Sequence, residues 1–385
     1  MAIFLNNDDQ EKSITPESAM DALAHGIKQL AEGNALRRPR VDNLIPTENP
    51  ENYFSLSSME GGVRDPGYFA VRLKPDIYGW VKRFGKMRET TYNTRPGLYG
   101  GLVLLFSTRN AALLAIMNDG YVQHLRVAAT AALGMKYLSR ENSHVLGIYG
   151  SGGMAKFFPL TAKVARPIER IQVYSPNREH LETYLEVMKP KVNCEIVPMD
   201  NAEKVVRGAD ILASCTTSME PVAQPDWIRP GMHLNSVTPW EFSPEVCAKI
   251  DAAGILVRRT PPSAKGLIDD GFGMKLHVLS WIAGTPEERA KVPTGPQSED
   301  RYVNARIVDC CDWKSGRTYS DDRRRDEITV LANHSYGTIE GDFGISAGIQ
   351  GVQFASIAGR IYEGAVKKGL GHKFPEDMFV QNIPT

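Results

Sequence analysis

The sequence has no excess charge of either sign, few cysteines and no long apolar run, and each absence excludes a class of function. Its 385 residues contain 45 Lys+Arg and 45 Asp+Glu, so no net field attracts a polyanion and a nucleic-acid partner is not expected. No apolar run approaches the length of a bilayer span, and the first thirty residues do not resemble a signal peptide, so we expect no membrane partner.

The few cysteines are not arranged as a metal site or a disulfide framework. They are Cys194, Cys215, Cys247, Cys310 and Cys311. None forms a C-x-x-C motif, and a chain of this length needs no covalent cross-links to build a core. We therefore expect a reducing, cytoplasmic location and no bound metal.

The central part of the chain alternates short apolar runs with helical stretches. A chain of 385 residues favours two domains, and this alternation predicts that one of them is an α/β domain with a Rossmann-type, doubly wound parallel sheet. The expected strands are 145–149, 171–175, 194–198, 211–215, 233–237 and 254–258.

The flanking parts have a different pattern. Residues 53–60, 68–74 and 101–107 are rich in β-formers and separated by Gly and Pro, which is typical of antiparallel strands. Asn118 or Asp119 is expected to cap a helix over 121–140.

A second helix is expected over 348–371, ending at a glycine cap, whereas 260–326 shows little regular pattern. We therefore predict a mixed α+β domain formed by the N- and C-terminal segments, 1–125 and 331–385, around a cofactor-binding domain at 126–330.

A glycine-rich motif follows the first strand of the central domain. The strand "VLGIY" runs into Gly150, Gly152 and Ala155, which form G-x-G-x-x-A at a strand-to-helix junction. Gly150 permits a tight turn, Gly152 removes the Cβ that would block a pyrophosphate, and Ala155 lets helix and strand approach closely. The motif favours a dinucleotide site over a glycine turn in an empty domain.

The second strand ends without the acidic residue that usually binds the ribose 2′-hydroxyl of NAD. Ser175, Asn177 and Arg178 stand there instead. A hydroxyl, an amide and a guanidinium suit a 2′-phosphate. We predict NADP(H), with NAD(H) or ordinary loop capping as the alternatives.

Four further residues end strands at the edge where a bound dinucleotide would lie. Thr216 and Thr217 follow the fourth strand, and Ser236 and Val237 end the fifth. The predicted cofactor-binding residues are Gly150, Ser151, Gly152, Gly153, Met154, Ser175, Asn177, Arg178, Thr216, Thr217, Ser236 and Val237.

Several stretches resemble the ornithine cyclodeaminase and μ-crystallin family. They are "LRVAATAALGMKYLSR" (125–140), "GIYGSGGMA" (147–155), "GADILASCTTS" (208–218), "RPGMHLNSV" (229–237) and "GRTYSDDRRRDEITV" (316–330). The resemblance runs in matching order from about Arg40 to Gly371. It implies a homodimer in which the outer domain supplies the substrate site and dimer contacts, while the Rossmann domain carries a nicotinamide nucleotide.

The resemblance also implies a reaction class. The leading prediction is an NADPH-dependent reductase or dehydrogenase that acts on an imine, a ketimine or an amino or imino acid by hydride transfer. A cyclodeaminase-type ammonia lyase with bound NAD(P) and a non-catalytic, nucleotide-loaded ligand-binding protein like μ-crystallin remain alternatives.

Two arginines match substrate-binding positions of the family. Arg126 matches a helix arginine that binds a substrate carboxylate, and Arg40 matches a second one. A guanidinium binds a carboxylate bidentately, and a buried arginine without an anion is unfavourable. A structural ion pair is the alternative for each.

The sequence departs from the family at two catalytic positions. Arg72 occupies the place of the usual catalytic lysine, and Lys74, on the same strand face, is a candidate to replace it. Glu241 is the candidate for an aspartate that follows "HLNSV" in cyclodeaminases. These departures disfavour ornithine cyclisation, whereas reductive chemistry depends mostly on positioning and electrostatics. The predicted catalytic residues are Arg72, Lys74 and Glu241.

Overall fold

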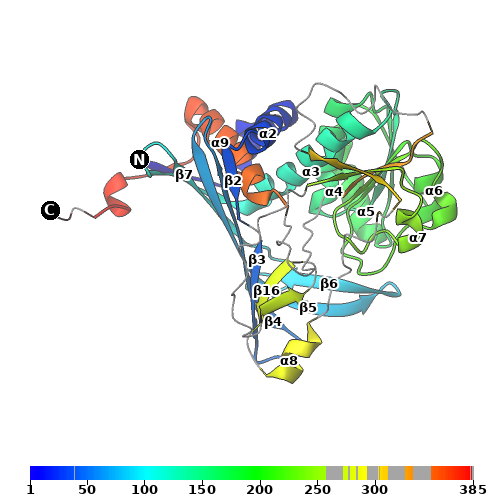
Figure 1. The fold of residues 1–385 in the computed structure, drawn as a ribbon, viewed down its shortest axis with the longest axis horizontal. Coiled ribbons are helices and arrows are strands. Elements are labelled where there is room, and N and C mark those ends of the chain that lie inside the picture. The colour runs from blue at the N-terminus through cyan, green and yellow to red at the C-terminus, as the bar shows by residue number, and fades with distance from the viewer. Residues whose placement is uncertain are drawn as a thin grey trace.

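A computed structural model describes most of the chain. It covers residues 1–38, 40–256, 272–275, 278–282, 285–292, 302, 304–310, 326–332, 348–381 and 383. Two sheets dominate this part of the protein, and helices pack between and around them (Figure 1).

The first sheet is fully parallel and confirms the predicted Rossmann-type α/β fold. Its strand order is β11-β10-β9-β12-β13-β18-β14-β17. The strands are β9 (Val145–Tyr149), β10 (Arg170–Tyr174), β11 (Glu195–Pro198), β12 (Ile211–Ser214), β13 (His233–Ser236), β14 (Ala252–Ile255), β17 (Arg306–Asp309) and β18 (Thr329–Ala332). From β9 the chain adds β10 and β11 on one side, and then returns to add β12 and β13 on the other side. The strand order thus reverses at β9, and in such sheets a ligand binds outside the carboxyl ends of the two strands at the reversal, here β9 and β12.

Helices lie between the strands of this sheet. They are α4 (Gly153–Ala165), α5 (Arg178–Met188), α6 (Ala202–Arg207) and α7 (Pro244–Cys247). Their apolar faces and the sheet form two buried clusters, one against α4 and α5 and the other against α6 and α7.

The second sheet is mixed and mostly antiparallel. Its order is β15-β16-β3-β4-β5-β7-β8-β1-β19, with β2 beside β4 and β6 beside β5. The strands are β1 (Ala2–Leu5), β2 (Ala35–Arg37), β3 (Val41–Pro46), β4 (Tyr53–Val63), β5 (Tyr68–Arg83), β6 (Lys86–Tyr92), β7 (Leu102–Ser107), β8 (Leu113–Asn118), β15 (Phe272–Lys275), β16 (Val278–Ile282) and β19 (His372–Phe374).

Strands β15 and β16 join this mixed sheet through β3, although they fall in the range predicted for the cofactor domain. The short α8 (Pro286–Lys291) follows them. The other predicted domain limits, at 125/126 and 330/331, stay predictions.

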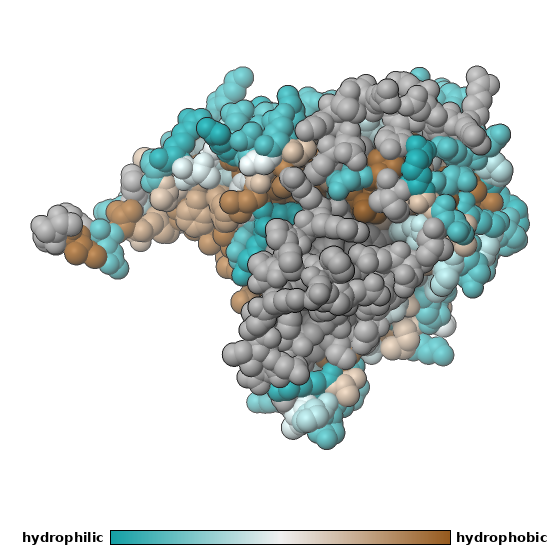
Figure 2. All heavy atoms as spheres, in the orientation of Figure 1, coloured by the Kyte–Doolittle hydropathy of each residue, from teal (hydrophilic) through white to brown (hydrophobic). Residues whose placement is uncertain are grey.

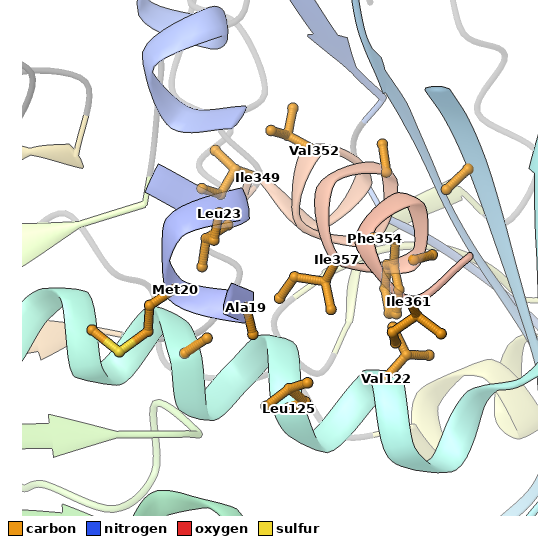
Figure 3. Close-up of a cluster of buried hydrophobic side chains, with 14 of the residues drawn as sticks. Ala19, Met20, Leu23, Val122, Leu125, Ile349, Val352, Phe354, Ile357 and Ile361 are labelled. Carbon is orange, nitrogen blue, oxygen red and sulfur yellow. The ribbon is translucent and has the colours of Figure 1, made fainter. Parts of the chain in front are cut away.

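Three helices build the core beside the mixed sheet. They are α2 (Pro16–Ala31), α3 (Asp119–Leu138) and α9 (Gln350–Lys368), with the short α1 (Asn7–Ser13) next to them. Figure 3 shows Leu23 of α2, Leu125 of α3 and Ile357 of α9 pointing toward one another. The opposite face of α3 packs on α4 through Ala128 and Ala131, so α3 connects the two cores.

Local sequence signals explain the ends of these helices. The Asn118 side chain accepts a hydrogen bond from Gly120 N, and this cap confirms the expected start of α3. Helix α9 ends at Gly369 in the left-handed region, at φ 65°. No helix within the described ranges has the length and apolar character needed to cross a membrane.

Candidate functional site

The glycine turn after β9 leaves room for a ligand. Gly150 has φ 100°, and a Cβ there would lie 2.4 Å from the carbonyl oxygen of Cys215, so only glycine fits. A Cβ built on Gly152 meets no atom within 4 Å. Gly152 caps α4 without a side-chain hydrogen bond, so the first N–H groups of the helix face this open space. The turn therefore fits a pyrophosphate, as the motif predicts.

The end of β10 is polar and carries no carboxylate. Ser175 is buried, and its hydroxyl accepts a hydrogen bond from Asn177 N. The Asn177 side chain caps α5 by accepting from His180 N, while Arg178 is exposed. The capping alternative thus describes Asn177, and Ser175 and Arg178 stay predicted ligands of a phosphate.

Glu241 ties together the loops that follow β12 and β13. One of its oxygens accepts hydrogen bonds from Thr216 N and Oγ1, at 2.8 and 2.9 Å. The other accepts from Val237 N and Thr238 N, at 2.8 and 3.0 Å. Burial raises the pKa of this carboxyl, and these hydrogen bonds partly oppose that shift. With both oxygens engaged, the geometry favours a role in positioning the crevice loops over the predicted proton transfer.

Arg126 is buried without a carboxylate partner in the described part of the chain. Its guanidinium donates to the neutral oxygens of Gln353 (2.8 Å) and Gln123 (3.0 and 3.2 Å), and it is only 8% exposed. Burial, together with the positive charges of Arg72 and Arg40, lowers its pKa well below the usual value. Such a cation is an anion-binding group that lacks its anion.

Arg72 is held in a buried ion pair. Its guanidinium donates two hydrogen bonds to one carboxylate oxygen of Asp119, at 2.6 and 2.9 Å. Arg72 and Arg126 both lie over the ring of Phe354, at 5.4 and 5.2 Å from its centroid. The ring of Phe354 thus lies beside two guanidinium groups, and among the described residues only that of Arg72 is ion-paired with an acid.

The next residues on the same face of β5 form a second pair. The ammonium of Lys74 contacts a carboxylate oxygen of Asp76, whose other oxygen has no hydrogen-bond partner among the residues that the structure describes. Burial lowers the pKa of Lys74, and nearby Arg72 adds to this while Asp76 opposes it. Burial also raises the pKa of Asp76. This pair can therefore exchange a proton more readily than an exposed lysine could.

Arg40 completes this charged face. It donates bidentately to Asp42, at 2.8 and 2.9 Å, and this observation matches the ion-pair alternative for Arg40. Glu89 of β6 lies near both, and burial raises its pKa to about 7. The structure therefore gathers Arg40, Arg72 and Lys74 on one sheet face, with Arg126 opposite on α3.

Residues 75–242 match the family model described as ornithine cyclodeaminase/mu-crystallin. The similarity to this family is shown for this part of the chain. The match contains the whole glycine turn and the loops held by Glu241, and it confirms the resemblance.

Curated relatives of this chain include two named reductases. Ketimine reductase mu-crystallin of Macropus fuliginosus is 27% identical over 61% of this chain and 70% of its own length. Delta(1)-pyrroline-2-carboxylate reductase of Bacillus cereus is 24% identical over 61% of this chain and 67% of its own length. Matches to three further relatives span 62%, 64% and 63% of their lengths.

The fold is shared with a solved structure across nearly the whole chain. The Delta(1)-pyrroline-2-carboxylate reductase of Thermococcus litoralis, solved with NADH and L-proline, covers 97% of this chain and 100% of its own. The TM-score is 0.68 at 21% identity. The shared fold therefore extends beyond the matched residues 75–242.

Several site residues were not predicted from the sequence. Asp76 and Asp119 pair with predicted residues, and Gln353 binds Arg126 from α9. The alternation of charged and apolar residues along 71–76 was the available signal for Asp76, because every second side chain of a strand shares a face. Gln353 has no such signal, since it reaches Arg126 only through tertiary packing.

His124 of α3 lies beside the glycine turn. A Cβ on Gly153 would lie 2.8 Å from the His124 ring, which also packs on Phe157 at 5.4 Å between centroids. Burial lowers the pKa of His124 to about 4.

This histidine predicts a pH dependence of stability. Its folded-state pKa lies below the unfolded value, so the unfolded chain binds more protons between about pH 4 and 6.5. The free energy of unfolding should therefore rise by about 2–3 kcal/mol from pH 4 to 6.5 because of His124. Urea unfolding across this range should show that His124→Gln flattens the rise. The matched control is the exposed His180→Gln, and equal curves for all three proteins would contradict the prediction.

Proposed function

We propose that the protein is an NAD(P)H-dependent reductase that transfers hydride to the C=N carbon of an imino acid or ketimine carrying a carboxylate. One observation carries the proposal: Arg126 is a buried guanidinium with no carboxylate bound to it among the described residues, on the same helix as His124, which contacts the glycine turn. The named reductases among the relatives support this reaction class.

In the proposed mechanism, Arg126 binds the substrate carboxylate and orients the imine. The ion pair with Asp119 holds the positively charged side chain of Arg72 in place beside Arg126. A reduced nicotinamide, when bound at the glycine turn, would supply the hydride. Lys74 then gives a proton to the imine nitrogen, so that C=N, hydride and proton yield the amine.

The proposed cofactor is NADP(H). The support is the polar, acid-free end of β10, where Ser175 and Arg178 offer a hydroxyl and a permanent charge to a 2′-phosphate. NAD(H) remains the alternative. The free thiols of Cys194 and Cys247 support the proposed cytoplasmic location.

The reaction can be tested with the purified full chain. NADPH oxidation should be followed with cyclic imino acids and with keto acids mixed with amines. We expect turnover with at least one carboxylated imine and none with its decarboxylated analogue. NADPH binding without oxidation in either class would contradict the reductase proposal and favour a ligand-binding protein, whereas ammonia release from a diamino acid without net oxidation would favour a cyclodeaminase.

We further propose a homodimer formed through the outer face of the mixed sheet. Side chains along each strand point alternately to the buried face and to this outer face. Apolar side chains on the outer face are exposed: Ile45 by 51%, Phe54 by 37% and Leu102 by 41%. Figure 2 shows part of this face as a hydrophobic area near β7. A second copy is the proposed occupant, because two-fold pairing would cover the same apolar face of both copies.

A charge-insertion variant tests the dimer. Phe54→Lys combined with Leu102→Lys is expected to convert a dimer into a monomer in sedimentation analysis, because both lysines would be buried without partners. Val366→Lys is the matched control, since Val366 is 55% exposed on α9, away from this face. A wild-type chain that stays monomeric at micromolar concentration would overturn the proposal.

A further inference from the structure

Strands β5 and β6 extend beyond the mixed sheet as a two-stranded ribbon. Past Tyr78, the described residues of β5 pair only with β6, and the ribbon turns at Phe84 and Gly85, which have φ of 51° and 75°. In Figure 1 the ribbon projects beneath the parallel sheet. An element of the mixed sheet therefore reaches the cofactor side of the protein.

The ribbon binds the loop that follows β12. Glu89 N donates to Thr217 O at 3.3 Å, and Met219 N donates to Met87 O at 2.9 Å. Arg88 and Ser218 thereby form an antiparallel bridge. The same loop begins at Thr216, which Glu241 holds at the edge of the crevice. The ribbon is thus attached to one wall of the predicted cofactor site.

Arg88 of this ribbon has no carboxylate partner in the parts of the chain that the structure describes. Its side chain makes only long hydrogen bonds, to Arg83 O at 3.3 Å and to Thr217 Oγ1 at 3.5 Å, and it lies over the Phe84 ring at 5.5 Å. Burial lowers its pKa, and the one group that opposes this shift is Tyr174. A partly desolvated guanidinium in this position lacks an anion.

The position of Tyr174 shows which part of a dinucleotide would lie nearby. Tyr174 is the last residue of β10 and is followed directly by Ser175. In this type of fold, the residues after the second strand lie beside the adenosine ribose. Tyr174 pairs with Tyr149 of β9, and Tyr149 pairs on its other side with Ser214 at the end of β12. The end of β10 and the loop that holds Arg88 therefore flank the same glycine turn, which places Arg88 on the side of the ribose rather than of the nicotinamide.

We propose that Arg88 binds the 2′-phosphate of NADP(H) from the mixed sheet, opposite the residues that follow β10. This inference rests on the proposed nucleotide-dependent function and names a residue outside the Rossmann sheet. Ser175 and Arg178 approach the phosphate from one side, and the ribbon supplies a second guanidinium from the other. Cofactor selectivity then depends on the attachment of the ribbon to the loop after β12.

Calorimetric titration of the full chain with NADPH and with NADH tests the assignment. Arg88→Ala is expected to weaken NADPH binding about tenfold or more and NADH binding less than about threefold, because the contact is a charged one to phosphate. Arg88→Lys should lie between wild type and Arg88→Ala for NADPH. Lys82→Ala is the matched control, since Lys82 is an exposed cation of the same ribbon, and it should bind both nucleotides as wild type does.

The outcomes separate this inference from the proposed function. Equal losses for the two nucleotides, or no loss for either, would overturn the assignment of Arg88 while leaving the reductase proposal intact. A wild-type chain that binds neither nucleotide would overturn both. If Arg88→Ala does not fold, a wild-type NADPH affinity in Arg88→Lys and in Arg88→Gln would overturn the assignment.

Discussion

Replacing Arg126 by glutamine is expected to raise the KM for the substrate roughly 30- to 100-fold, because a bidentate charged contact contributes about 2–3 kcal/mol to carboxylate binding. The same change should raise the melting temperature. Arg126 is buried beside Arg72 and makes no ion pair in the part of the chain that the structure describes, and removing a poorly compensated buried charge stabilises the folded state. Steady-state kinetics and thermal unfolding of one preparation measure both effects.

A second buried arginine provides the matched control. Arg166 is also 8% exposed, but its guanidinium donates to the Ser139 hydroxyl and to the carbonyl oxygens of Lys136, Ser139, Arg140 and Ala165 at 2.7–2.9 Å. Arg166→Gln should therefore lower the melting temperature and leave KM unchanged. If Arg126→Gln instead lost stability and kept its KM, Arg126 would be structural.

The parallel sheet was predictable because its signals are local. Several of its strands contain short apolar runs, as in 145–149, and the glycine turn requires residue types that few other structures require. Strand β17 was missed, because its sequence RIVD begins and ends with a charged residue. The N-terminal helices α1 and α2 were missed, although Asn6 and Asp9 form a capping box at the start of α1. A seven-residue helix has too few turns to show an apolar period, so its cap was the available signal.

The charged part of the site was only partly predictable. Arg72, Lys74 and Arg126 were found from a resemblance in sequence, but their partners come from other elements. Asp119 was expected as a possible helix cap, whereas Asn118 takes the capping role and Asp119 binds Arg72. An aspartate can cap a helix or form a buried ion pair. Which of the two Asp119 does depends on the packing of α3 against β5, which the local sequence does not reveal.

The ribbon formed by β5 and β6 illustrates a further limit. Strand β6 mixes charged and polar residues, so its sequence shows little alternation of apolar and polar positions. Its partners lie on β5 and on the loop after β12, which is 129 residues away at the contact between Arg88 and Thr217. Contacts of this range carry no short-range signal, and they bring Arg88 to the loop after β12.

Replacing Gly152 by aspartate is expected to abolish nucleotide binding without loss of stability. A Cβ at Gly152 meets open space in the protein, and φ −79° with ψ −170° suits any residue. Aspartate is a favoured helix N-cap, so α4 should form as well or better. Its side chain would, however, occupy the space of the pyrophosphate and repel it, weakening binding by about a hundredfold or more.

Gly150→Ala is the contrasting variant. At φ 100°, with a Cβ 2.4 Å from the Cys215 carbonyl, alanine is strained whether or not a ligand is present. We expect it to lower the free energy of unfolding by about 1–3 kcal/mol. The two variants thus separate the turn's role in folding from its role in binding.

The central claim is that the turn between β9 and α4 binds the pyrophosphate of a nicotinamide nucleotide. It is tested most directly by titrating wild type and Gly152→Asp with NADPH, following nucleotide fluorescence, after thermal unfolding has shown that both are folded. The account predicts saturable binding to wild type and none to the variant at the same concentrations. Equal binding by the two proteins would contradict it.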